Sequence, residues 1–172
     1  MADSPESQSF CCPDHSGHAP AQAILAQAES RVKAHGLRLT PVRRRTLEIL
    51  LKAHGALGAY DVLEQLAADG FGAQPPVAYR ALNFLVDNGL AHRIRRLNAF
   101  TACAHPGHDH RAAFLICETC ESVTEAPSDA VGAALGAAAQ DMGFALSRAT
   151  IEAVGQCREC IAREAADQRT IA

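Results

Sequence analysis

The sequence predicts an α+β protein: a winged helix-turn-helix domain followed by a small α+β domain. Two observations favour this fold class. Four segments with helical spacing of apolar residues precede a two-stranded hairpin, and the rest of the chain alternates short β-rich runs with one Ala-rich helix. Charge divides along the same line, because residues 22–96 hold 11 basic and 6 acidic side chains whereas residues 97–172 hold 5 and 10. One half is therefore expected to face an anion and the other a cation.

In the first half, helices are expected over residues 21–35, 40–54, 59–68 and 75–89. Apolar residues recur on one face of each segment. Gly36 and Gly55 end the first two segments, Asp-Gly at 69–70 ends the third, and Asn-Gly at 88–89 closes the fourth. Thr40 is the expected N-cap of the second helix, with Pro41 at its first position. The run "LAHRIRRLNAFTAC" alternates about a turn near Leu97 and Asn98, which predicts a hairpin.

In the second half, "RAAFLIC" and "SVTEA" read as strands, and residues 127–143 as a helix capped by Ser128. A third strand is expected within residues 144–157. A unit of this size needs a staple or a partner subunit. The expected organisation is a polar tail at 1–21, a winged-helix domain at 22–102, a connection at 103–112 and a second domain at 113–172.

Composition excludes several classes of protein. The chain of 172 residues contains no run of about 18 apolar residues and no secretory signal pattern, so a membrane span is not expected and a cytosolic location is. In that compartment, seven cysteines indicate metal binding or redox chemistry before disulfides.

Two Cys-x-x-Cys pairs give the strongest local signal: Cys117 with Cys120, and Cys157 with Cys160. Four thiolates suit tetrahedral Zn²⁺, and the 36 residues between the pairs leave room for a strand, a helix and another strand. Four unrelated thiols or two redox motifs are the alternatives, but neither pair is expected to open a helix after a βαβ strand, as the redox motif would require. A closed site of four thiolates stabilises the fold and leaves no open position for catalysis.

A second set of ligand types surrounds the connection. His92, Cys103, His110 and Glu125 together would form a neutral tetrahedral site that favours Zn²⁺, and a metal bound there would tie the two halves together. The alternative is a solvated histidine-rich loop. His108 is a possible alternate ligand, and His105 is expected to be solvated.

The sequence resembles the ferric uptake regulator (Fur) superfamily and, within it, the zinc uptake regulators (Zur). The resemblance covers most of residues 37–160 and is carried by these stretches: "LRLTPVRRRTLEIL", "AYDVLEQL", "PPVAYRALNFLVDNGLAHRI", "HDHRAAFLICETCESV" and "GFALSRATIEAVGQCREC". It implies a bacterial, cytoplasmic, homodimeric winged-helix repressor that binds DNA when loaded with metal. It also implies that residues 113–172 are the dimerisation domain.

The resemblance further implies two zinc ions per subunit. Cys117, Cys120, Cys157 and Cys160 fall on the structural positions, and His92, Cys103, His110 and Glu125 fall on the zinc-sensing positions. A thiolate at Cys103 resembles the zinc sensors more than the iron, manganese or peroxide sensors, which are the alternative within the superfamily. Gly107 and Val154 replace ligands of an additional site found in some members, so no third zinc is expected.

The expected partner is a palindromic double-stranded DNA operator, read by the helix at 76–88 in the major groove. Tyr79 and Arg80 lie near its N-terminal end. Candidate phosphate contacts are Tyr60, Arg43, Arg44 and Arg45, with Arg93, Arg95 and Arg96 in the wing; a solvated helix face is the alternative for these arginines. No small-molecule substrate is expected.

A role as an enzyme or metal buffer, and a metal site in the N-terminal tail, are both disfavoured by the sequence. A zinc enzyme or a metal-buffering protein is a remote alternative, because catalytic zinc needs an open position and a general base, and no HExxH helix is present. The chain is therefore not expected to be an enzyme. Cys11, Cys12, His15 and His18 lie in a tail without apolar anchors, so no specific metal site is expected there.

Overall fold

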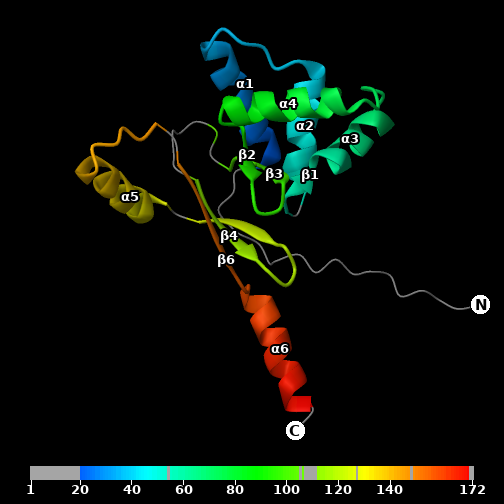
Figure 1. Cartoon of the computed structure of the whole chain (residues 1–172). Coiled ribbons are helices and arrows are strands. Elements are labelled where there is room, and N and C mark those ends of the chain that lie inside the picture. The colour runs from blue at the N-terminus through cyan, green and yellow to red at the C-terminus, as the bar shows by residue number, and fades with distance from the viewer. Residues whose placement is uncertain are drawn as a thin grey trace, which may run out of the picture.

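The structure of the protein is a computed structural model that describes residues 20–53, 55–104, 106, 112–126, 128–147 and 149–170. Its helices and two small sheets form an α+β fold, as the sequence predicts. Helices α1–α4 gather at one end of the molecule and α6 extends from the other (Figure 1). None of the helices formed by these residues is long and apolar enough to span a membrane.

The winged half (residues 20–104) packs four helices on a three-stranded sheet. The helices are α1 Ala21–Ala34, α2 Pro41–Lys52, α3 Ala59–Ala68 and α4 Pro75–Asp87. The sheet has the order β1-β3-β2, and its strands are β1 Leu57–Gly58, β2 Ala91–Ile94 and β3 Ala99–Ala102. One apolar cluster joins all of these helices, because each contributes a buried stripe at helical spacing.

The β4–β6 half (residues 112–170) is built on a second sheet of three strands. Its elements are β4 Ala112–Cys117, β5 Val123–Ala126, α5 Asp129–Asp141, β6 Thr150–Gly155 and α6 Arg158–Thr170. The central strand β4 pairs antiparallel with β5 and parallel with β6. The parallel partner must be reached by a crossover connection, and α5 lies in that crossover.

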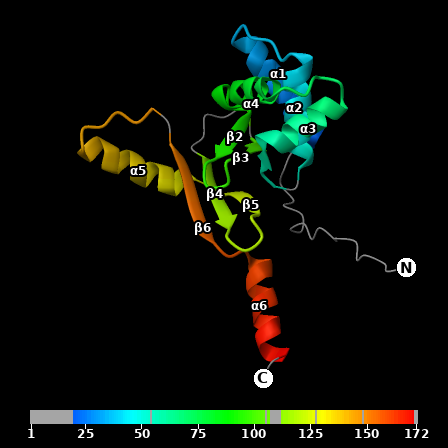
Figure 2. The ribbon, with the colours of Figure 1, turned by 45° about the vertical axis from the view of Figure 1, so that its right-hand side comes forward.

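The two halves meet at the β2–β3 hairpin and one face of β4. Ile94 of the hairpin clusters with Phe114 and Ile116 of β4, and Leu97 at the turn packs against the same cluster. In both ribbon views the hairpin lies next to the β4–β6 sheet, on the side of the winged half that faces it (Figures 1 and 2). The strand β4 therefore carries contacts between the halves as well as holding its own sheet together.

One local expectation is corrected. The strand expected within 144–157 covers only Thr150–Gly155, because its hydrogen-bonding partner β4 is six residues long. Thr40 is the N-cap of α2 and Ser128 the N-cap of α5, as expected, although neither makes a side-chain cap hydrogen bond. The helix α6 and the two-residue strand β1 were not predicted. Residues 1–19 lie outside the described residues, and so do Cys11, Cys12, His15 and His18.

Candidate metal centres and nucleic-acid interface

The structure brings the four Cys-x-x-Cys sulfurs together. Cys117 ends β4 and Cys120 lies in the turn toward β5, while Cys157 and Cys160 lie just after β6 and in the first turn of α6. The parallel pairing of β4 with β6 places both pairs at the same end of the sheet, because parallel strands end on one edge. All four sulfur atoms lie within 4.8 Å of one another, and none is in a disulfide.

Backbone groups of this site favour the ionised form of some thiols. The N–H of Cys157 donates to Sγ of Cys117 over 3.3 Å, and this hydrogen bond lowers the pKa of Cys117 to about 6. The N–H of Cys160 likewise lowers the pKa of Cys157. Burial acts in the opposite direction on Cys160 and raises its pKa to about 12. Negative charge is thus favoured at part of a crowded sulfur cluster, which suits a bound cation.

The sulfur geometry fits a tetrahedral zinc ion. With Zn–S bonds of about 2.3 Å, the edge of a ZnS₄ tetrahedron is about 3.8 Å. The Sγ atoms of Cys120 and Cys157, which belong to different pairs, are 3.8 Å apart. The residues present therefore fit the zinc ion expected from the sequence. A bound zinc there would stabilise the fold, since four protein ligands fill its coordination shell.

Two of the four expected sensor residues, His92 and Glu125, lie beside Phe114 at the junction of the halves. His92 is half-buried on β2, and its ring centroid lies 5.2 Å from that of Phe114. Glu125 is paired with Phe114 across β5 and β4, so both side chains lie on the same face of the sheet. Cys103 is fully buried directly after β3. His110, the possible alternate ligand His108, and His105 lie outside the described residues.

The expected DNA-reading residues of α3 and α4 are exposed. Tyr79 and Arg80 lie on the outer face of α4, opposite the buried stripe that includes Ala78 and Leu82. Tyr60, near the start of α3, is 67% exposed. All three side chains are therefore accessible to a binding partner.

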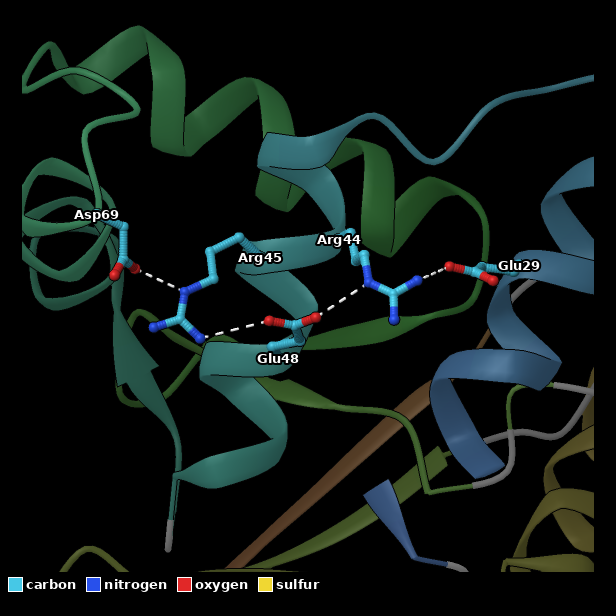
Figure 3. Close-up of polar contacts among 5 residues, drawn as sticks. All are labelled: Glu29, Arg44, Arg45, Glu48 and Asp69. Carbon is cyan, nitrogen blue, oxygen red and sulfur yellow. Dashed lines mark hydrogen bonds and ion pairs between the residues drawn. The ribbon is translucent and has the colours of Figure 1, made fainter. Parts of the chain in front are cut away.

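The three arginines of α2 have partners inside the winged half. Arg44 pairs with Glu29 of α1 and with Glu48, and Arg45 pairs with Glu48 and, over 2.6 Å, with Asp69 (Figure 3). The hydrogen bond that Arg45 donates to the Asp69 carboxylate raises the pKa of Arg45.

Arg43 lies 3.6 Å above the ring of Phe84 and donates to the carbonyl of Arg38. The arginines of α2 therefore tie α1 and the end of α3 to α2, and phosphate contact by Arg44 or Arg45 would require an exchange of carboxylate for phosphate.

Comparison with known proteins places the chain in a family. Residues 34–154 match the model of the ferric uptake regulator family. The chain belongs to the ferric uptake regulator family. Its relatives in this family include the zinc uptake regulation protein of Escherichia coli strain K12, 37% identical over 145 residues that cover 84% of this chain and 85% of the relative. Another is the peroxide operon regulator of Bacillus subtilis strain 168, 26% identical over 140 residues that cover 81% and 95%.

A solved structure of a zinc uptake regulator complexed with zinc and DNA is similar to this chain with a TM-score of 0.80 and 36% identity. The match covers 86% of this chain and 99% of that one. The prediction of the ferric uptake regulator family, with a resemblance to the zinc uptake regulators, is confirmed. As a member of a family of regulators, the chain is not an enzyme.

One contact at the junction was not anticipated. Glu152 of β6 accepts hydrogen bonds from the backbone N–H groups of Arg95 and Arg96, at the turn of the β2–β3 hairpin. No sequence pattern indicates it, because the partners are main-chain groups more than fifty residues away.

Proposed function

We propose that this protein is a zinc-responsive transcriptional repressor of zinc-uptake genes, acting as a homodimer in the bacterial cytoplasm. The observation that carries the proposal is the similarity, over nearly the whole of the solved chain, to a zinc uptake regulator complexed with zinc and DNA. The four-sulfur cluster and the exposed residues of α3 and α4 support it, because they supply a metal site and a surface for DNA. In this proposal, residues 22–102 bind DNA and residues 113–172 dimerise.

Two zinc ions per subunit have different tasks in this proposal. Cys117, Cys120, Cys157 and Cys160 hold a structural ion, and the chemistry it supplies is cross-linking of β4, β6 and α6. The second ion is sensed by His92, Cys103, His110 and Glu125. Because His92 lies on the hairpin and Glu125 on the β4–β6 sheet, the sensor ligands come from both halves. Zinc at this site would favour one orientation of the halves, and DNA would select the same orientation.

The apolar surface of the β4–β6 half supports the homodimer. Leu115 of β4 is 54% exposed on the face of the sheet opposite Phe114. The crossover helix α5 of the same half also exposes Val131 and Leu135. Exposed apolar side chains of this kind can mark an interaction surface, and homodimers are the commonest oligomers. Leu115→Lys is expected to convert a dimer into a monomer in analytical ultracentrifugation; an unchanged mass would contradict this placement of the interface.

Measurements of DNA binding test which metal ion the protein responds to. A duplex is first selected from a random library with zinc-loaded protein, and its dissociation constant is then measured in buffers that fix free Zn²⁺, Fe²⁺ or Mn²⁺. The proposal predicts tight, specific binding at low free Zn²⁺, a pseudo-palindromic selected sequence and steep salt dependence. Tight binding with Fe²⁺ and none with Zn²⁺ would assign the protein to the iron- or peroxide-responsive group instead.

A further inference from the structure

We infer that Glu152 is a positioning residue: it holds the β2–β3 hairpin against the β4–β6 sheet before zinc binds the sensor residues, and so prepares the orientation that this zinc then stabilises. The inference rests on the proposed function for its link to zinc and DNA. The contact itself is independent of that function.

The contact is bidentate and uses only the main chain of the hairpin. The N–H of Arg95 lies 2.7 Å from Oε1 of Glu152, and the N–H of Arg96 lies 3.0 Å from Oε2. Two successive backbone N–H groups that converge on one anion form a small concave anion site. Hydrogen bonds to a carboxylate are about twice as strong as neutral ones, and two of them fix direction as well as distance.

The position of Glu152 in the sheet connects it with the sensor residues. Phe114 of the central strand is paired with Glu125 on one side and with Glu152 on the other. Residues paired across strands lie on one face of the sheet, so the row Glu125–Phe114–Glu152 presents two carboxylates flanking one ring. That ring contacts His92 of the hairpin. One carboxylate of the row is expected to bind zinc, and the other holds the hairpin that carries His92.

Loss of the Glu152 contact is expected to raise the free zinc that the protein needs. The apparent affinity of a ligand falls in proportion to the fraction of molecules that are in the binding-competent conformation. Without the Glu152 contact, fewer molecules that lack zinc at the sensor residues hold His92 beside Phe114 and Glu125. More free zinc is then required for the same occupancy. Saturating zinc restores the orientation, so the affinity for DNA at saturation changes little.

The test compares Glu152→Gln and Glu152→Ala with Asp141→Asn, which removes one negative charge from the exposed end of α5 in the same half. Two readouts are measured on full-length protein: the free Zn²⁺ at half-maximal binding of the selected duplex, and hydrogen exchange of the Arg95 and Arg96 amides without DNA. For Glu152→Gln the zinc requirement is expected to rise about tenfold, equivalent to ~1.4 kcal/mol. DNA affinity at saturating zinc should stay within about threefold of the wild type.

In the hydrogen-exchange measurement, Glu152→Ala should exchange both amides faster, whereas Asp141→Asn should match the wild type in both readouts. Unchanged exchange of both amides in Glu152→Ala would overturn the inference. So would an unchanged zinc requirement in a zinc-responsive wild type, or a loss of DNA affinity that saturating zinc does not restore. A wild type that binds no DNA with zinc would refute the proposed function, and the exchange experiment would still decide whether Glu152 holds the hairpin.

Discussion

Removal of zinc from the four-cysteine cluster should unfold the β4–β6 half and leave the winged half folded. Among the described residues of the β4–β6 half, Phe114 and Ile116 are the buried apolar side chains larger than cysteine. Burying them contributes about 1.5–3 kcal/mol each, or roughly 3–6 kcal/mol together. Apparent zinc binding to a structural site contributes about 10–16 kcal/mol. The metal is therefore the larger stabilising contribution, whereas the winged half has its own core across α1–α4.

Hydrogen exchange measures the two halves separately. After zinc is removed by a chelator, and its loss is verified by native mass spectrometry, the amides of β4 and β6 should lose at least about 10³-fold of protection, equivalent to about 4 kcal/mol. The amides of α2–α4 should change by less than about threefold. Cys103→Ser is the matched control, because it removes one thiol and leaves the four-cysteine cluster intact. If β4 and β6 keep their protection in protein shown to be zinc-free, the reasoning about the small core is wrong.

Three further predictions concern DNA contact, ion pairing and proton release. If the Arg80 guanidinium hydrogen-bonds a base edge, Arg80→Ala should weaken binding of the selected duplex by about 1–3 kcal/mol, roughly 5–150-fold, as measured by fluorescence anisotropy. An unchanged affinity would exclude a base contact by Arg80. Asp69→Asn should lower the free energy of unfolding by only about 0.2–1 kcal/mol in urea titrations, because its pair with Arg45 is partly exposed, and a loss above about 2 kcal/mol would contradict that. Zinc binding to the cluster at pH 7.5 should release close to four protons in calorimetry across buffers, because the zinc-free β4–β6 half is expected to be unfolded and its thiols then have an ordinary pKa of ~8.5, in place of the lowered pKa of about 6 that Cys117 has in the folded half. Release of about three protons would show that Cys117 stays ionised, and its surroundings folded, without zinc.

Much of the fold could be predicted because local signals agree with packing. The helix expected at 59–68 forms over the same residues, since its apolar stripe and the following Asp-Gly act together. The hairpin turn near Leu97 and Asn98 also forms, and Asn98 adopts a φ of 49°, a conformation that Asn tolerates better than most residues. Helix α6 was missed because its polar sequence has no apolar stripe to indicate a period.

The functional sites could be predicted where their residues form a recognisable sequence motif. They could not be predicted where a side chain binds backbone groups far away in the sequence. Two Cys-x-x-Cys pairs in one chain predict a shared metal site, and the parallel pairing of β4 with β6 explains how the two pairs come together. The partners of Arg44 and Arg45 come from three different helices or their ends, so sequence alone suggested only a basic cluster. Glu152 gave no signal at all, because a carboxylate that binds backbone N–H groups requires no particular residue on the other side.

In the proposed function, zinc is sensed at a site separate from the four-cysteine cluster. This separation is tested by titrating wild type and Cys103→Ser with buffered Zn²⁺ while duplex binding and bound zinc per subunit are recorded on the same samples. The wild type is expected to bind two zinc ions per subunit and to bind DNA in a zinc-dependent manner. Cys103→Ser should stay folded with one zinc ion and lose the DNA response. A Cys103→Ser variant that binds DNA at the same free zinc as the wild type would show that Cys103 is not part of the sensor site.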